Sequence, residues 1–370
     1  MLGSMHALAA LRRGFEVVQL ERERDARGAS VRNFGLIWVS GRPPGEELAF
    51  ALRSRGMWEE LAAEIPELGF RANGSLTLVQ TPAELAVLEQ VLARPDAAER
   101  ELELLDPRQV RALNPAVRGD VHAGLYCPRD AAVEPRQVPG AIRGALERDP
   151  SYRWLPDRHV VELDDGSVRD HRDERHTGDL VLVCPGAFGG FAGWLPEEAP
   201  LRRVRLQMLE TEPLPEPLTT ALADGDSLRY YPAFDVPARD ELPPPEPLVD
   251  ALKIQLLVQQ RLDGSLTVGD THEYDEPFGV SVAEDAYEHL ARRVEELLGR
   301  PMPPVRRRWA GVYSQALDDR LYFREQLGAS TWIVTGAGGR GMTLAPAIAE
   351  DVLEAVGYEL GIATASSTGR

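Results

Sequence analysis

The chain has 370 residues, of which 27% are charged, and its formal net charge is −18. This length is enough for two domains with large cores, and the negative charge argues against a general surface for nucleic acid or for an anionic membrane. The two cysteines, Cys127 and Cys184, are far apart and match no metal or redox spacing. No apolar run is long enough to span a bilayer. We therefore expect a cytoplasmic protein without nucleic-acid or membrane partners.

The first 35 residues have the pattern of the second half of a dinucleotide-binding βαβ unit. An apolar helix runs to residue 13, Gly14 ends it, and a short strand follows over residues 15–20. Glu21 then stands where such units place an acid for a ribose hydroxyl, if Gly3 is the last glycine of the phosphate loop. The first strand and the earlier glycines are not in the sequence. We therefore expect a Rossmann-like unit that lacks its first strand.

The remaining elements are predicted from apolar periodicity and from capping and turn residues. The helices are expected over residues 46–65, 81–93, 106–113, 134–147, 283–298 and 345–356. Strands are expected over residues 124–127, 152–168 (turning at 164–166), 180–183, 203–209, 228–232, 251–260, 266–269, 306–313 and 331–334. Residues 69–79 are predicted to form a hairpin that turns at Asn73-Gly74. The later strands alternate as in an antiparallel sheet.

Four glycines lie between the apolar strand at 331–334 and the last helix, within residues 336–341. So many glycines allow backbone N–H groups to approach a ligand at a helix N-terminus. A second apolar strand, 180–183, ends abruptly at Cys184, where a loop begins. We expect the strand ends at Glu21, Cys184 and Thr335 to converge on one edge of a parallel sheet, where ligands bind.

Seven segments, spread over nearly the whole chain, carry a family resemblance. They are the stretch from Gly3 to Glu21, GASVRNFG (28–35), GLYCPRDAAVEP (124–135), DLVLVCPGAF (179–188), VGDTHEYD (268–275), RWAGV (308–312) and TGAGGRGMTLAP (335–346). In this order they resemble the flavin amine oxidoreductases that include D-amino-acid oxidase, glycine oxidase and sarcosine oxidase. The run GASVRNFGLIW (28–38) further resembles the branch associated with phosphonate catabolism, whose proposed substrates are aminophosphonates.

The resemblance implies an α/β fold with two domains. One is a Rossmann-like FAD-binding domain, truncated at its first strand, and the other is a substrate domain with a mostly antiparallel sheet. We assign residues 1–66, 133–195 and 305–370 to the FAD-binding domain, and residues 67–132 and 196–304 to the substrate-binding domain. FAD is expected to bind noncovalently, because neither cysteine matches a position of covalent attachment.

The resemblance also implies which residues contact the cofactor. Gly3 and Glu21 would hold the pyrophosphate and the adenosine ribose. Val160 would contact the adenine side, and residues 338–343 would hold the pyrimidine end of the flavin. The full set of expected cofactor-binding residues is Gly3, Glu21, Arg22, Ser30, Arg32, Asn33, Gly35, Val160, Gly186, Gly311, Gly338, Gly339, Arg340, Gly341, Met342 and Thr343.

One departure from the family pattern concerns the substrate. Family members that act on amino acids often place an arginine two residues after the WAG glycine to bind the carboxylate, and here that residue is Tyr313. An ordinary α-amino acid is therefore not expected. The candidates for binding the substrate are Arg32, Gln207, Tyr231, His272, Tyr313 and Arg340, with Tyr230 and Arg229 as weaker ones. Each of these residues also has an ordinary structural interpretation.

The implied chemistry is hydride transfer from a C–H bond beside a neutral amine nitrogen to the flavin, followed by imine hydrolysis. No side chain is assigned as a certain catalytic residue, because the flavin takes the hydride. The expected partners are a small amine and either oxygen or an electron carrier. Two alternatives stay open, a dehydrogenase that uses a carrier and a truncated, non-catalytic flavin-fold protein. His171 and His176 have no neighbours in sequence that complete a metal site, so no metal is expected.

Overall fold

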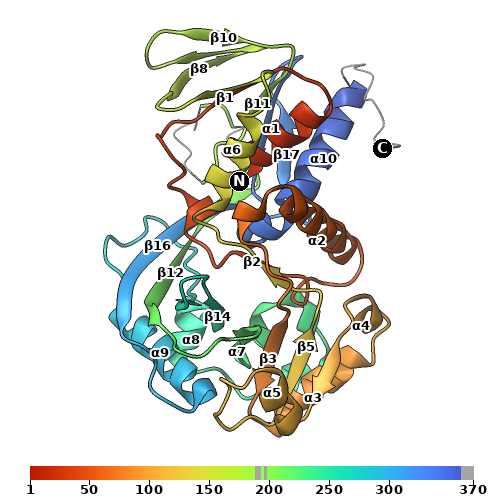
Figure 1. The fold of residues 1–370 in the computed structure, drawn as a ribbon, viewed down its shortest axis with the longest axis vertical. Coiled ribbons are helices and arrows are strands. Elements are labelled where there is room, and N and C mark those ends of the chain that lie inside the picture. The colour runs from red at the N-terminus through yellow and green to blue at the C-terminus, as the bar shows by residue number, and fades with distance from the viewer. Residues whose placement is uncertain (188–192, 196–197, 360–370) are drawn as a thin grey trace.

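The computed structural model describes residues 1–187, 193–195 and 198–359. Figure 1 shows a large twisted sheet with its helices in the lower part. A second body of helices and small sheets, called the upper body below, lies above it. The helices are α1 (Leu2–Arg12), α2 (Glu46–Glu64), α3 (Pro82–Leu92), α4 (Asp96–Glu99), α5 (Pro107–Leu113), α6 (Val138–Leu146), α7 (Asp226–Tyr230), α8 (Pro247–Leu252), α9 (Glu284–Leu298) and α10 (Gly341–Glu359). Within the described residues, no helix combines the length and the apolarity needed to cross a membrane.

The large sheet contains eight strands, and all neighbouring pairs except β13–β3 are antiparallel. In spatial order the strands are β16 (Val305–Ala316), β12 (Leu201–Pro213), β15 (Ser265–Gly269), β14 (Leu257–Gln260), β13 (Ala221–Ala223), β3 (Ser75–Val79), β5 (Ala123–Cys127) and β4 (Glu103–Leu105). The expected α/β fold with a mostly antiparallel second sheet is confirmed. The expected domain boundary at residue 305 separates β16 from this sheet, although β16 pairs with β12 along its length.

Alternation of side chains divides the large sheet between two cores. Leu209 faces the core that α9 covers, while its neighbour Met208 faces the opposite core, towards the upper body. Helix α9 fits the first core because its buried residues recur at helical spacing, as in Leu290, Val294 and Leu297. The second face of the sheet is therefore the one that meets the upper body.

The upper body holds the helices α1, α2, α6 and α10 and four small sheets (Figure 1). Its strands are β1 (Val17–Leu20), β2 (Leu36–Ile37), β6 (Ala131–Ala132), β7 (Tyr152–Leu155), β8 (Val160–Asp164), β9 (Ser167–Asp170), β10 (Arg175–Thr177), β11 (Val181–Val183), β17 (Phe323–Gln326) and β18 (Thr331–Thr335). Helix α10 packs between α1 and α2, and its buried face includes Ala345, Ile348 and Val352. These helices hold the small sheets in place.

The predicted parallel sheet is divided into two pieces. Strand β1 pairs in parallel with β7, and β11 pairs in parallel with β18, but no described strand joins the two sheets. The expectation of a single sheet edge was therefore wrong. Strands β1 and β11 nevertheless line one cavity along their lengths.

Three local predictions also differ from the structure. Residues 69–79 form no hairpin, because β3 pairs with β5 and β13, and the N–H of Gly74 donates to the carbonyl of Asp130. Residues 228–232 are not a strand, since α7 ends at Tyr230 and a 3₁₀ turn follows. Residues 251–260 split into the end of α8, a left-handed Lys253 (φ 46°) and the short strand β14. Pairing with remote segments replaces the expected hairpin, and it also holds β14, which pairs with β13 and β15.

Candidate active site

A cavity of about 1300 Å³ lies between the upper body and the large sheet. The strand ends at Glu21, Cys184 and Thr335 line its upper side, together with the first turn of α1. Side chains of the large sheet, such as Leu206 on β12 and Tyr313 on β16, line the opposite side. The three strand ends therefore line one cavity, although they belong to two sheets. A cavity of this size exceeds what a drug-sized ligand needs.

The glycine turn, residues 336–341, joins β18 to the N-terminus of α10 inside this cavity. Gly336 and Gly338 have φ values of 73° and 62°, which favour glycine. A Cβ on Gly336 would also stand 2.7 Å from a methyl carbon of Leu201. Residues 341–343, the first turn of the 19-residue helix α10, line the cavity. The positive end of a helix dipole at this point favours an anionic ligand group.

The N-terminus of α1 contacts the same cavity from another direction. A Cβ on Gly3 would stand 3.6 Å from the Cβ of Cys184 and 3.9 Å from Nε2 of Gln19, so this turn lies between the ends of β1 and β11. The terminal ammonium of Met1 donates to Oγ of Ser30 at 2.7 Å. A second helix N-terminus therefore faces the space between the two small sheets.

The end of the cavity beside the large sheet is rich in tyrosine. The rings of Tyr230 and Tyr231 make an edge contact at 5.1 Å between centroids, and Tyr231 also lies 6.0 Å from Trp38. Tyr274 and Tyr313 line the same region. Burial raises the pKa values of Tyr231 and Tyr313, so their hydroxyls stay protonated at neutral pH. This part of the cavity offers aromatic faces and neutral hydroxyl groups.

Most of the residues predicted from the sequence line this cavity. They are Gly3, Glu21, Arg22, Ser30, Asn33, Val160, Gly186, Tyr231, His272, Tyr313, Gly338, Gly339, Arg340, Gly341, Met342 and Thr343. Arg340 is already paired, because its Nη1 lies 2.8 Å from Oε2 of Glu47. The structure thus brings together residues that lie more than 300 positions apart in the sequence. Their roles towards a ligand stay predictions.

Four predicted residues lie outside the lining of the cavity, namely Arg32, Gly35, Gly311 and Gln207. Arg32 donates to the carbonyl of Ala310, and a Cβ on Gly35 would stand 2.2 Å from the carbonyl oxygen of Val133. A Cβ on Gly311 would stand 3.3 Å from the carbonyl oxygen of Arg32. These positions hold the wall of the cavity in place, and we leave them out of the proposed site.

Gln207 and Arg229 have structural partners as well. The amide of Gln207 donates to Oε1 of Glu273 at 2.7 Å and accepts from the N–H of Ala283. Arg229 donates to the carbonyl of Pro243 and does not line the cavity. Residues that sequence reasoning missed include Asp270 and Gln255, both of which line it. Asp270 lies inside the segment VGDTHEYD, whose acid directly after a strand was the available signal.

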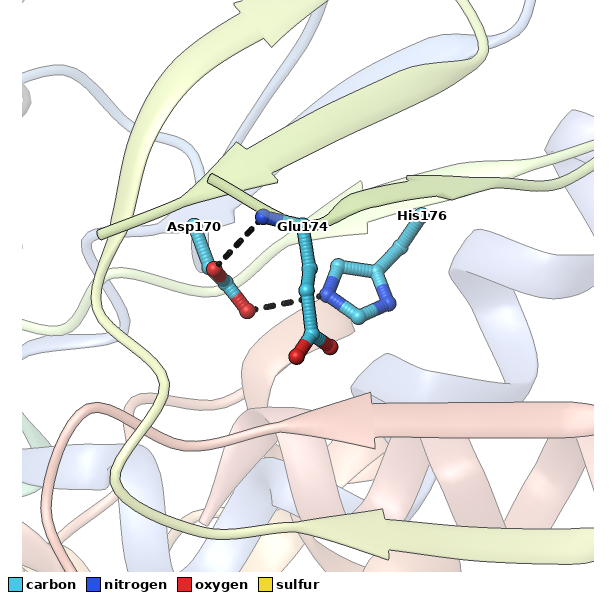
Figure 2. A group of neighbouring side chains, drawn as sticks. All are labelled: Asp170, Glu174 and His176. Atoms are coloured by element: carbon cyan, nitrogen blue, oxygen red, sulfur yellow. Dashed lines mark hydrogen bonds and ion pairs between the residues drawn. The ribbon is translucent and has the colours of Figure 1, made fainter. Parts of the chain in front are cut away.

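In the part of the chain that the structure describes, one group of side chains has the composition of a metal site. Figure 2 shows Asp170, Glu174 and His176 on and between β9 and β10. Nε2 of His176 lies 3.0 Å from Oδ2 of Asp170. Nη1 of Arg158 lies 2.7 Å from a carboxylate oxygen of Asp170 and of Glu174. A guanidinium between the two carboxylates already supplies the positive charge. We interpret the group as an ion-pair network.

This network predicts a pH-dependent contribution to stability. Burial opposes ionisation of Asp170, but hydrogen bonds from His176, Arg158 and two backbone amides outweigh it and lower its pKa. A lowered folded pKa stabilises the fold above the unfolded value of about 3.9, and that stability is lost as the pH falls towards the folded value. D170N should therefore reduce the urea midpoint at pH 7 and have a smaller effect at pH 3. An equal reduction at both pH values would contradict this assignment.

Comparison with known proteins identifies the family. The family model DAO, described as FAD dependent oxidoreductase, matches residues 1–355. This chain belongs to the FAD-dependent oxidoreductase family. FAD is the cofactor of that family, and the glycine turn, the two helix N-termini and the cavity of this chain suit a long anionic ligand.

Solved structures of similar fold cover nearly the whole of this chain. Glycine oxidase from Bacillus cereus ATCC 14579 has a TM-score of 0.77 and 16% identity, covering 97% of this chain and 93% of that one. Iminodiacetate oxidase from Chelativorans sp. BNC1 has a TM-score of 0.74 and 19% identity, with the same coverages. L-alpha-glycerophosphate oxidase from Mycoplasma pneumoniae with FAD bound has a TM-score of 0.72 and 16% identity, covering 96% and 92%. At these identities the similarity establishes the fold.

Curated relatives match over shorter stretches. The mitochondrial pyruvate dehydrogenase phosphatase regulatory subunit of Mus musculus is 27% identical over 234 residues, which are 58% of this chain and 26% of the mouse protein. The bifunctional tRNA 5-methylaminomethyl-2-thiouridine biosynthesis protein MnmC of Maricaulis maris (strain MCS10) is 36% identical over 109 residues, 29% of this chain and 18% of MnmC. The matched region thus spans about a quarter or less of each of these relatives.

Proposed function

We propose that this oxidoreductase oxidises a small amine at the C–H bond beside its nitrogen, by oxidative deamination or N-dealkylation. The observation that carries the proposal is the junction between the glycine turn and the tyrosine-rich end of the cavity. A Cβ on Gly339 would stand 3.5 Å from the hydroxyl oxygen of Tyr313. A ligand on the glycine turn therefore adjoins a small compartment with aromatic faces, which suits a small organic substrate.

FAD would be held noncovalently across the upper side of the cavity. The first turn of α10 and the glycine turn would face an anionic part of the cofactor, and Glu21 would accept from a ribose hydroxyl. Gly186 has open space where a Cβ would stand and a φ of 64°, so the backbone there can approach a ligand closely. Bound FAD supplies the acceptor for the two electrons removed from the amine.

We propose an aminophosphonate or a related N-alkylated amine as the substrate. Tyr313 lines the cavity where amino-acid oxidases of the family often have an arginine, so the recognition of an anion must use other groups. The hydroxyls of Tyr231 and Tyr313 and the guanidinium of Arg340 are the candidate donors. Cys127 and Cys184 are both free thiols, which agrees with our further proposal that the protein works in the cytoplasm.

A non-catalytic role is the second candidate. Two observations favour it, the division of the small parallel sheet between β1 and β11 and the similarity to a protein named as a regulatory subunit. In that case the cavity would bind FAD weakly or serve only to stabilise the fold. Flavin binding without reduction by any amine would favour this candidate.

The test of the proposed function is a flavin experiment. The full chain, purified and incubated with FAD, should retain flavin absorbance bands after gel filtration. Under anaerobic conditions 2-aminoethylphosphonate should bleach these bands, whereas glycine and N-methylglycine serve as the comparison substrates. Peroxide release in air would separate an oxidase from a dehydrogenase that uses a carrier. Protein that stays colourless would contradict the proposal, and bleaching by plain α-amino acids alone would contradict the substrate class.

A further inference from the structure

Three buried polar side chains meet at the tyrosine-rich end of the cavity, namely Gln255, Asp270 and His272. Gln255 precedes β14 and Asp270 follows β15, and their backbones exchange hydrogen bonds of 2.8 and 3.2 Å. The amide of Gln255 also donates to Oδ1 of Asp270 at 3.3 Å. Adjacent strands of the large sheet therefore fix the position of this carboxyl group.

The hydrogen bonds of His272 leave an acceptor atom beside Asp270. Nδ1 of His272 lies 3.0 Å from the carbonyl oxygen of Lys253, which can only accept, so Nδ1 carries the ring proton. Burial lowers the pKa of His272 to about 4, so the ring is neutral at pH 7. Nε2 is then an acceptor, and it lies 3.9 Å from Oδ2 of Asp270. That separation is too long for a direct hydrogen bond.

The carboxyl group of Asp270 also lacks a cationic partner. Among the described residues, no arginine or lysine forms an ion pair with it, and its side chain is almost fully buried. Burial raises the pKa of Asp270 to about 8, although hydrogen bonds from the Gln255 amide and from backbone partly offset this. Oε1 of Gln255 is a further buried acceptor with no hydrogen-bond partner. Among the described residues the carboxyl group of Asp270 thus has only neutral hydrogen-bond donors, and the free acceptor atom of Gln255 belongs to one of them, which suits a cation with N–H groups.

Aromatic rings enclose this point. The ring of Tyr230 stacks on that of His272 at 4.2 Å between centroids, and Tyr231 accepts from Nε2 of Gln255 at 3.2 Å. Electron-rich ring faces attract organic ammonium groups, most strongly where water is excluded. The compartment therefore combines a buried acid with an aromatic enclosure, and both features favour an alkylammonium ion.

We propose that Asp270 binds the protonated amine of the substrate and then accepts its proton, with Nε2 of His272 as a second hydrogen-bond acceptor. In this step an N–H bond breaks, its electron pair stays on nitrogen, and an O–H bond forms on Oδ2 of Asp270. The product is the neutral amine that hydride removal requires. The assignment rests on the proposed amine oxidation, and it makes Asp270 a catalytic residue of that reaction.

The pH behaviour of Asp270 follows from its surroundings. The ionisable groups that influence this compartment are Tyr230, Tyr231, His272, Tyr274 and Tyr313, with Arg42, Arg202 and Lys253 acting on them from further away. The tyrosine hydroxyls and the His272 ring are uncharged near neutrality, so Asp270 is the group that changes charge between pH 6 and 9. Ammonium binding should strengthen as its carboxyl ionises.

The test is a calorimetric titration of the FAD-incubated full chain with n-propylammonium, and with 1-propanol as the neutral probe of similar size. We expect wild-type protein to bind propylammonium at least tenfold more tightly than propanol. D270N should lose at least tenfold in affinity for propylammonium and keep its affinity for propanol. D275N removes an exposed carboxylate from the same loop and should bind as the wild type does.

A pH series and a second variant keep the test independent of folding. The affinity of wild-type protein should rise by about tenfold between pH 6 and 7 and by about fivefold between pH 7 and 8, while that of D270N stays level. D270E should regain part of the lost affinity. The proposal is overturned if D270N binds like the wild type, or if the pH series of the two proteins coincide. A flavin-loaded enzyme that is reduced by amines would then keep its proposed function without this role for Asp270. Conversely, Asp270-dependent binding to a protein that takes up no flavin would refute only the proposed function.

Discussion

Replacing Asp130 with alanine should lower the free energy of unfolding by about 3–5 kcal/mol, because several buried donors would lose their acceptor at a cost of about 1–3 kcal/mol each. The Asp130 side chain is fully buried. Its carboxylate accepts hydrogen bonds from the backbone N–H of Val39 (2.5 Å) and of Ser40 (3.0 Å), and from the hydroxyls of Ser40 and Ser75 (both 2.6 Å). Alanine would leave four buried donors without an acceptor.

The loss of these hydrogen bonds should also disturb the candidate site, because Asp130 links two parts of its wall. Ser75 begins β3 of the large sheet, whereas Val39 and Ser40 belong to the segment between β2 and α2 that carries Trp38 into the cavity. Urea unfolding followed by circular dichroism measures the effect. D120A, which removes an exposed carboxylate before the opposite end of β5, is the control and should change stability by less than about 0.5 kcal/mol. A loss below about 1 kcal/mol for D130A would show that the network matters little.

Replacing Gly339 with leucine should weaken FAD binding by about 100-fold, which corresponds to about 2.7 kcal/mol. Gly339 does not have a positive φ, so leucine causes no backbone strain there. The added side chain would instead extend into the cavity towards the hydroxyl of Tyr313. The substitution therefore tests the occupation of this space rather than the folding of the turn.

Fluorescence titration with FAD measures the affinity, and the thermal midpoint shows whether the fold is intact. The matched control is G144L on α6, where a Cβ would meet nothing within 4 Å and the residue lies outside the cavity. This variant should bind FAD like the wild type and should be slightly more stable, because glycine is a poor helix former. Unchanged FAD affinity in the Gly339 variant would place the flavin elsewhere.

The sequence alone predicted features that depend on near neighbours in the chain. Helix α3 begins where Thr81 and Glu84 predict it, because these two residues form a capping box within one helical turn. The glycine turn before α10 was also recognisable, since Gly336 and Gly338 have the positive φ values for which glycine is suited. The pattern of residues 283–298 predicted helix α9 in the same way. All of these depend on residues a few positions apart.

Tertiary structure decided the features that depend on distant partners. Residues 228–232 look like a strand, but the short helix α7 ends at Tyr230, and the hydroxyl of Ser227 in that helix donates to the remote carbonyl of Leu256. The parallel sheet divides between β1 and β11 because no described strand lies between them. The acid at Asp270 gained its perturbed pKa only when the fold buried it between Gln255 and His272, without a cation beside it. Local conformation, such as a helix start or a glycine turn, could be predicted from the sequence. Burial and charge pairing arise only when remote segments meet.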